Sequence, residues 1–385
     1  MRILFVSGTS IGGSAHSTRE LADRLVEHGH HVAVLFRIEG APRTRQLHKR
    51  AINLVVKLGR SPLARPVDAV AAMLSRRPRR ADEAVPYEVW ETSIPENSLR
   101  SVLKSFGPDV VVASSIGRVA WRRIRAELAE LGIPSVLYLR EQSALGHLTI
   151  SEAPPDLLMA NAHTYVERAA SLGHAALMVP SVVSVDRYLV KSTRERVLFV
   201  NPVDSYGLET ALALAGARPD VSFAFVEWWE LDDVQRRALE EQLARLPNVV
   251  LRPATTDPGA VYADARVLLA PFLLDGRPRV VLEAQANGIP VLASDLPALR
   301  ETVGTDGHFV GAEAPVAEWA AALGDLIDDP VRYQAASDAA RAHAHREEVD
   351  PDVIVSRFER ALADLIANFR NPARGPKDSS GAATT

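Results

Sequence analysis

The chain of 385 residues contains no cysteine, which excludes a disulfide framework, a thiol nucleophile and thiolate metal sites such as zinc fingers. No apolar run approaches the ~18 residues that span a bilayer, and the opening MRILFVSGTS is too short for a secretory signal. Neither charge dominates, because 44 Lys and Arg against 48 Asp and Glu leave a net charge of −4. This balance predicts no nucleic-acid partner, and together these absences predict a cytoplasmic protein.

What the chain does contain is enough apolar sequence for more than one core. Apolar residues make up 47% of it, which excludes an intrinsically disordered chain. Single hydrophobic cores stop growing at roughly 250–300 residues, so a chain of this length is expected to form two domains.

Short apolar runs alternate with helical patterns along most of the chain. The first unit consists of RILFVS (2–7), a helical stretch with Ser14 as its expected cap, and HVAVLF (31–36). Further runs begin near residues 109, 135, 156 and 176, and a second series begins near residues 196, 221, 248, 265 and 289. Continuous apolar runs are typical of parallel strands buried on both faces. The pattern predicts an α/β protein with two Rossmann-like, doubly wound parallel sheets facing across a cleft.

The domain organisation follows from these two series. We expect a first domain over 1–185, a second over 195–345 and a C-terminal helix over 346–369 that crosses back to the first domain. Residues 370–385 have few bulky apolar groups and are expected to form a disordered tail.

Residues 41–80 interrupt the first domain with eleven Arg and Lys residues against one acidic residue, Asp68. Such a charge run is usually a solvated helical insertion. It could also bind an anionic acceptor or contact a membrane surface peripherally, and the sequence leaves both interpretations open.

The turn after the first strand carries two overlapping patterns. Gly8-Thr9-Ser10-Ile11-Gly12 matches the G-x-S-x-G elbow of serine hydrolases, with Ser10 as the nucleophile. The alternative is that Gly12 and Gly13 let the backbone approach a phosphate at the N-terminus of the following helix. The glycine spacings of nicotinamide-binding and P-loop motifs are absent, so no such cofactor is predicted.

Two acidic patterns occur in the second half of the chain. Asp350-Pro351-Asp352, close to His343 and His345, could suggest a metal site, but an acidic residue before an apolar helical stretch is more often an N-cap. No metal site is predicted. In the second pattern a strand ends at Pro271, a loop carries Asp275 and a helix carries Glu283, so both carboxylates can face the cleft.

The stretch 265–304 resembles the retaining glycosyltransferases of the two-Rossmann-domain (GT-B) type, specifically family four. The mark of that family is E-x7-E followed by A-x-x-x-G-x-P-V-x-A-S and a later Glu. The residues on this pattern are Asp275, Glu283, Ala284, Gly288, Pro290, Val291, Ala293, Ser294 and Glu301. Residues 12–35 and 160–188 are similar to the family's opening and to its segment before the interdomain linker.

The resemblance implies metal-independent transfer of a sugar from a UDP- or GDP-sugar to a small-molecule, glycan or lipid-linked acceptor, with retention at the anomeric carbon. It assigns the ribose hydroxyls to Glu283, sugar hydroxyls to Asp275 and a donor-site role to Glu301. Backbone groups around Gly276 would face the sugar and the diphosphate. The nucleotide sugar is a co-substrate, and no cofactor is implied.

The chain departs from the family at the two cations that bind the diphosphate of the donor, which we call the diphosphate clamp. Pro202 and Tyr206 occupy the positions at which the family has Arg and Lys. We therefore expect Tyr206 to belong to the donor site but to contribute no positive charge to it. Arg277 and Arg279 are the nearest replacement cations, because a guanidinium fork suits a diphosphate.

Other departures lie beside the reacting centre. The first carboxylate is Asp275 instead of Glu, and Arg140-Glu141 replaces the usual His. Either Glu141 or His147 is expected to orient the acceptor hydroxyl. These changes leave open a second interpretation, in which the chain is a non-catalytic GT-B relative that acts as a binding or activating partner.

Overall fold

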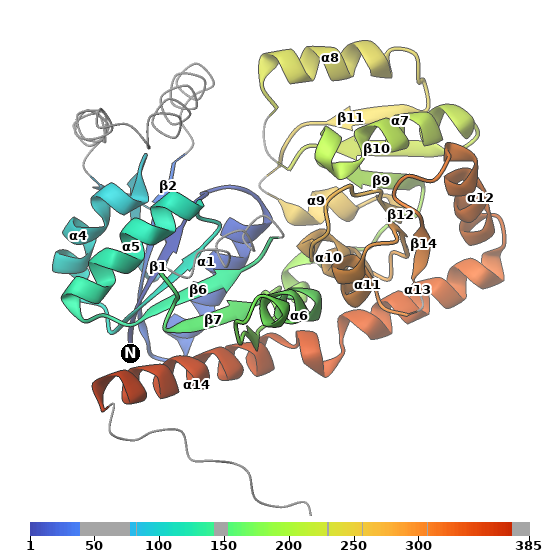
Figure 1. The fold of residues 1–385 in the computed structure, drawn as a ribbon. Coiled ribbons are helices and arrows are strands. Elements are labelled where there is room, and N and C mark those ends of the chain that lie inside the picture. The colour runs from blue at the N-terminus through green and yellow to red at the C-terminus, as the bar shows by residue number, and fades with distance from the viewer. Residues whose placement is uncertain are drawn as a thin grey trace, which may run out of the picture.

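The computed structural model describes residues 1–38, 78–81, 83–141, 153–228, 231–255, 257–305 and 307–371. Figure 1 shows two lobes, each built around one sheet, with the last helix lying along the first lobe. The predicted α/β architecture with two parallel-sheet domains is confirmed. Within the described ranges, no helix is both long and apolar enough to cross a membrane.

The first sheet has eight strands in the order β3-β4-β2-β1-β5-β6-β7-β8. They are β1 (Arg2–Ser7), β2 (His31–Arg37), β3 (Arg79–Arg80), β4 (Glu88–Thr92), β5 (Val110–Ser114), β6 (Ser135–Leu139), β7 (Leu157–Ala160) and β8 (Leu177–Met178). Every pairing is parallel except that of the short edge strand β3 with β4. The sequence analysis did not predict β3 and β4, because β3 has two residues and the EVWET segment of β4 mixes polar and apolar residues and lacks the continuous apolar run of a central strand.

Helices cover both faces of this sheet. The core on one face includes side chains of α1 (Gly12–Glu27), and the core on the other includes those of α4 (Pro95–Phe106), α5 (Arg118–Leu131) and α6 (His163–Ser171). The prediction that Ser14 caps α1 was wrong. The helix begins at Gly12, whose φ of 80° is left-handed, and Ile11 at the N-cap makes no side-chain bond.

The second sheet has the doubly wound order β11-β10-β9-β12-β13-β14. Its strands are β9 (Arg196–Val200), β10 (Ser222–Val226), β11 (Val249–Arg252), β12 (Ala265–Ala270), β13 (Val291–Ser294) and β14 (His308–Val310). Its helices are α7 (Leu208–Ala217), α8 (Asp233–Leu243), α9 (Pro258–Tyr262), α10 (Arg279–Ala286), α11 (Pro297–Val303), α12 (Val316–Ile327) and α13 (Pro330–Ala344). Only the three-residue strand β14 was absent from the predicted series.

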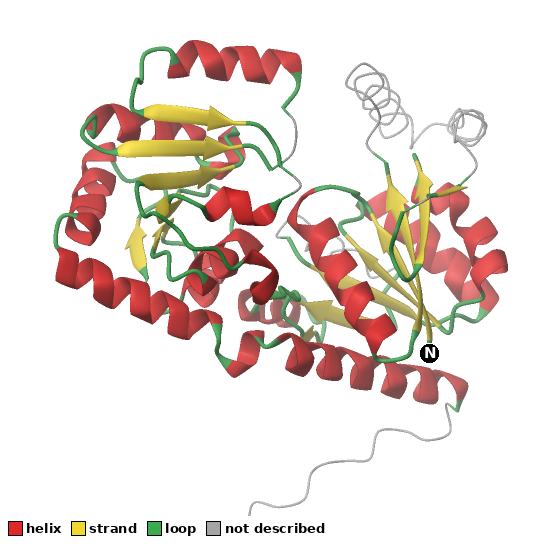
Figure 2. Ribbon diagram, turned by 180° about the vertical axis from the view of Figure 1, so that it is seen from behind, coloured by secondary structure: helices red, strands yellow, loops and turns green. Residues whose placement is uncertain are grey.

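Helix α14 (Pro351–Arg370) returns to the first domain, as the sequence predicted, and both ribbon views show it running along that domain (Figures 1 and 2). Phe358 stacks on Phe5 of β1 with ring centroids 6.0 Å apart. Asp350 accepts hydrogen bonds from the first turn of α14, so it is an N-cap. The helix begins at Pro351, five residues after the predicted start, because a 3-10 turn (Glu347–Val349) and the N-cap Asp350 precede it. It ends at Arg370, one residue beyond the prediction, and residues 372–385 of the predicted tail lie outside the described residues.

Candidate functional site

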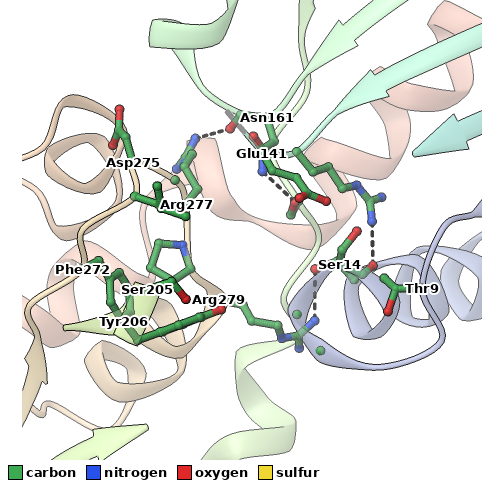
Figure 3. A pocket seen from close by; sticks show the side chains of 18 of the residues that line it. Thr9, Ser14, Glu141, Asn161, Ser205, Tyr206, Phe272, Asp275, Arg277 and Arg279 are labelled. Carbon is green, nitrogen blue, oxygen red and sulfur yellow. Dashed lines mark hydrogen bonds between the residues drawn. The ribbon is translucent and has the colours of Figure 1, made fainter. Parts of the chain in front are cut away.

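A cavity of about 500 Å³ opens between the two domains. Its walls come from the loops after β1, β6 and β7 of the first sheet and after β9 and β12 of the second (Figure 3). The carboxyl ends of parallel strands are where doubly wound proteins bind ligands. Eight of the predicted site residues line this cavity: Gly12, Gly13, Glu141, Tyr206, Asp275, Gly276, Arg277 and Arg279.

The turn after β1 forms part of the first-domain wall. Gly8 packs so closely that a Cβ there would lie 1.7 Å from the carbonyl oxygen of Ser115. Gly12 has positive φ and begins α1, whose N-terminus has no side-chain cap. Both glycines of the apparent hydrolase motif therefore have backbone reasons to be present. The uncapped N–H groups of α1 lie beside the cavity, as a phosphate-binding turn requires.

Arg140 directly follows β6 and lines the same wall, yet only 7% of its surface is exposed. Its Nη1 donates to the carbonyl oxygen of Ser14 and to Oγ1 of Thr18, both at 2.8 Å, and its guanidinium stacks over the ring of Tyr138. Burial lowers the pKa of Arg140. Glu141 also lines the cavity, whereas His147 lies outside the described residues.

In the second-domain wall, the Asp275 carboxylate accepts hydrogen bonds from the backbone N–H groups of Ala298 (2.9 Å) and Leu299 (3.3 Å), at the start of α11. In Figure 3 its side chain points away from Glu141 and Thr9. Burial raises the pKa of Asp275 against these bonds. In this conformation Asp275 stabilises a helix end at the edge of the cavity, and its sugar-binding role stays a prediction.

Arg277 reaches across the cleft. Its Nη1 donates to the carbonyl oxygen of Asn161, 2.9 Å away in the first domain, and its Nε donates to Oγ1 of Thr302. Burial lowers the pKa of Arg277. These partners are neutral, so the guanidinium keeps its charge beside the cavity.

Arg279 belongs to a buried charge cluster that joins the domains. Its Nε donates to Glu283 Oε1 at 2.6 Å, its Nη2 donates to Glu20 of α1, and its Nη1 donates to Ser17 at 3.2 Å. Burial alone would raise the pKa of Glu20, but Arg279 and the Tyr188 hydroxyl lower it. Two carboxylates therefore neutralise Arg279, although its side chain lines the cavity.

The structure places two predicted donor residues away from the cavity lining. Glu283 is 1% exposed, and its other oxygen accepts from the Tyr262 hydroxyl at 2.6 Å. Burial raises the pKa of Glu283 despite the neighbouring guanidinium. Glu301 accepts from the backbone N–H groups of His163 and Thr164, both at 2.8 Å, so it caps α6 across the domain interface. Their roles toward a donor stay predictions.

Sequence reasoning passed over several residues of the site. Arg140 and Asn161 each directly follow a strand, and that position is itself a signal that could have identified them. Glu20 lies in the middle of α1 and had no such signal, because only the tertiary structure brings it to Arg279. Trp228 packs edge-on against His16 of the first domain.

Residues 212–329 match the family described as Glycosyl transferases group 1. A D-inositol 3-phosphate glycosyltransferase from Gordonia bronchialis is 29% identical over 214 residues, which cover 54% of this chain and 42% of the relative. An MMP alpha-(1->4)-mannosyltransferase from Mycolicibacterium hassiacum is 38% identical over 113 residues, or 28% of each protein. The chain thus spans less than half the length of these curated relatives.

Solved structures share the whole architecture. Sucrose-phosphate synthase from Thermosynechococcus elongatus has a TM-score of 0.74 at 14% identity, over 95% of this chain and 99% of that one. HepE from Anabaena, solved in complex with UDP-glucose, has a TM-score of 0.70 at 15% identity, over 94% and 100%. At these identities the likeness concerns the fold, and it confirms the GT-B arrangement predicted from the sequence.

Proposed function

Because this chain has the GT-B fold and a second domain that matches the group 1 glycosyltransferases, we propose that it transfers a sugar from a nucleotide-diphosphate sugar to an acceptor. One observation carries the proposal. The interdomain cavity brings the uncapped N-terminus of α1 opposite the loop that carries Asp275, Gly276 and Arg277. Such a site offers donors to a diphosphate from one wall and polar groups to a sugar from the other.

The chemistry that this site would support is substitution at the anomeric carbon. The bond from that carbon to the diphosphate oxygen breaks, the diphosphate leaves with the electron pair, the acceptor oxygen forms the new bond, and the proton of the acceptor hydroxyl passes to the departing diphosphate. Stabilising the leaving negative charge is the main task, and donors placed in advance perform it. We propose retention of configuration and no requirement for a metal ion.

We propose a UDP- or GDP-sugar as the donor and a small-molecule, glycan or lipid-linked acceptor. The uridine alternative is supported by HepE, whose fold is shared and which was solved with UDP-glucose. Glu141 lines the cavity on the acceptor side and is proposed to orient the acceptor hydroxyl. We also propose peripheral membrane contact through the basic residues of 41–80, of which 41–77 lie outside the described part of the chain.

A specific observation favours a second candidate, a non-catalytic relative. Glu283 and Glu301 are both held in other bonds, and Asp275 faces the start of α11. A protein that had lost transfer could keep these bonds as permanent structure and act as a binding or activating partner.

Calorimetric titration with UDP, GDP, ADP and TDP tests the proposal. We expect micromolar affinity for one diphosphate. Absence of binding to all four would support the non-catalytic relative. With the matching nucleotide sugars, NMR of the anomeric proton of the product then reports retention or inversion, and an inverted product would contradict the proposed stereochemistry.

A further inference from the structure

The cleft contains three buried or half-buried arginines, and they differ in how their charges are balanced. Arg279 faces two carboxylates, at Glu20 and Glu283. Arg277 donates to a carbonyl and a hydroxyl. Arg140, from the opposite domain, also donates only to uncharged oxygens. The expected replacement clamp, Arg277 with Arg279, therefore has one member whose charge is already neutralised.

Arg140 is the buried cation whose bonding is least complete. Its Nε has no hydrogen-bond partner, and within the described residues no carboxylate forms an ion pair with it. Burying a charge without an ion pair is costly, and here burial lowers the pKa of Arg140 although the carboxylate of Glu141 acts in the opposite direction. Arg140 lines the cavity and no ion pair among the described residues neutralises its charge, so its guanidinium is suited to attract an anion of the ligand.

The surroundings of Arg140 indicate where that anion would lie. Its bonds to Ser14 and Thr18 fix the guanidinium against the first turns of α1, whose N-terminus has no side-chain cap. Tyr138 packs under Arg140, with the guanidinium carbon 4.3 Å from the centre of the ring. Arg140 and the N-terminus of α1 thus line the first-domain wall, and Arg277 lines the second-domain wall of the same cavity.

We propose that Arg140, supplied by the first domain, is the second cation of the diphosphate clamp and acts with Arg277 of the second domain. The inference rests on the proposed function, because the diphosphate is that of the nucleotide sugar. It moves the clamp away from positions 202 and 206, where Pro202 and Tyr206 carry no charge. A clamp divided between domains has a consequence: the diphosphate is held by both cations only when the cleft is closed.

The test compares the diphosphate with its nucleoside. Full-length protein carrying Arg140→Gln is titrated with the nucleoside diphosphate selected in the screen above, and separately with the matching nucleoside. One charge-assisted hydrogen bond corresponds to about a tenfold to a hundredfold change in Kd. We expect Kd for the diphosphate to rise by that factor and Kd for the nucleoside to change less than about twofold.

Arg100→Gln is the matched control, because Arg100 is a half-exposed arginine of the same domain, paired with Glu127 and Glu130 outside the cavity. It removes the same charge and should leave both affinities unchanged. Arg140→Lys is the variant to use if Arg140→Gln does not fold, because lysine keeps the positive charge but lacks the paired N–H donors of the guanidinium. It should fold as the unmodified protein does and show an intermediate loss for the diphosphate alone.

The outcomes separate the two proposals. If the unmodified chain binds a diphosphate and Arg140→Gln binds it equally well, or loses diphosphate and nucleoside to the same extent, the role of Arg140 is overturned and the proposed function stands. If Arg140→Gln does not fold, an unchanged diphosphate affinity in Arg140→Lys overturns that role instead. If the unmodified chain binds no diphosphate, both are overturned.

Discussion

Each wall of the cleft contains a buried arginine, and the two arginines differ in whether carboxylates balance their charge. On the second-domain wall, Arg279 is bonded to Glu283 of its own helix and to Glu20 of the facing domain. On the first-domain wall, Arg140 has no ionic partner among the described residues, and its Nε is unpaired. Arg279 and its two carboxylates contribute to the contact between the domains, whereas we propose that Arg140, which has no ion pair in the described part of the chain, uses its charge for a ligand. Position beside the cavity alone does not distinguish these roles.

Removing Arg279 is expected to give the largest effect. Arg279→Ala would leave Glu20 and Glu283 buried at the interface without their cation, and breaking a buried ion pair typically costs about 3–5 kcal/mol. Urea unfolding followed by circular dichroism measures the loss. Arg300→Ala, which breaks the exposed pair with Asp295, serves as control and should cost less than about 1 kcal/mol. If both variants lost the same free energy of unfolding, the buried ion pairs of Arg279 would be no more stabilising than an exposed pair.

Acid should weaken the same interface through His16, which packs against Trp228 across the cleft. Burial, together with Arg279 and Arg19, lowers the pKa of His16 from 6.5 to about 4. The unfolded chain therefore binds a proton at His16 as the pH falls below 6.5, while the folded chain does not, so stability is lost between pH 6.5 and 4.

From pH 7 to pH 5 the His16 contribution amounts to about 2 kcal/mol. His16→Gln should remove that part of the pH dependence, as measured by urea midpoints at the two pH values. An unchanged pH dependence in this variant would show that the ring titrates normally in the folded protein.

Domain closure is tested by Glu301, whose carboxylate caps α6 of the opposite domain. Glu301→Ala should cost about 1 kcal/mol, as the loss of a helix cap does, and should enlarge the radius of gyration measured by X-ray scattering. Asp232→Ala removes a cap within the second domain and should cost a similar amount without altering the radius. A larger radius in both variants, or in neither, would contradict an interdomain role for Glu301.

The smallest effect is expected at Ser10. Close packing at Gly8 and the positive φ of Gly12 account for the glycines of the hydrolase-like motif. Ser10→Ala should therefore leave transferase activity within about twofold, assayed by release of the nucleoside diphosphate. Loss of activity in this variant would make Ser10 a participant and would revive the hydrolase interpretation.

The sequence predicted the central strands of both sheets well, because continuous apolar runs identify strands buried on two faces. It missed β3 and β14 at the sheet edges and β4 next to an edge, which are short or of mixed polarity. It also pointed to Gly12, Gly13, Asp275 and Arg277, which line one cavity, because each lies shortly after the end of a strand, in a loop or in the first turn of α1. It could not reveal that the carboxylates of Glu283 and Glu301 were already engaged, because Glu283 bonds through a cluster completed by Glu20 and Glu301 bonds to α6 of the first domain.

The local pattern of residues in the sequence thus determined the fold class, the two domains and the loops that carry the site. Apolar periodicity and glycine geometry act over a few residues and can be read directly from the sequence. The charge balance of each arginine was decided only by the tertiary structure. Glu20 and Arg279 are 259 positions apart in the chain, and ionic contact between such residues depends on how two separately folded domains meet.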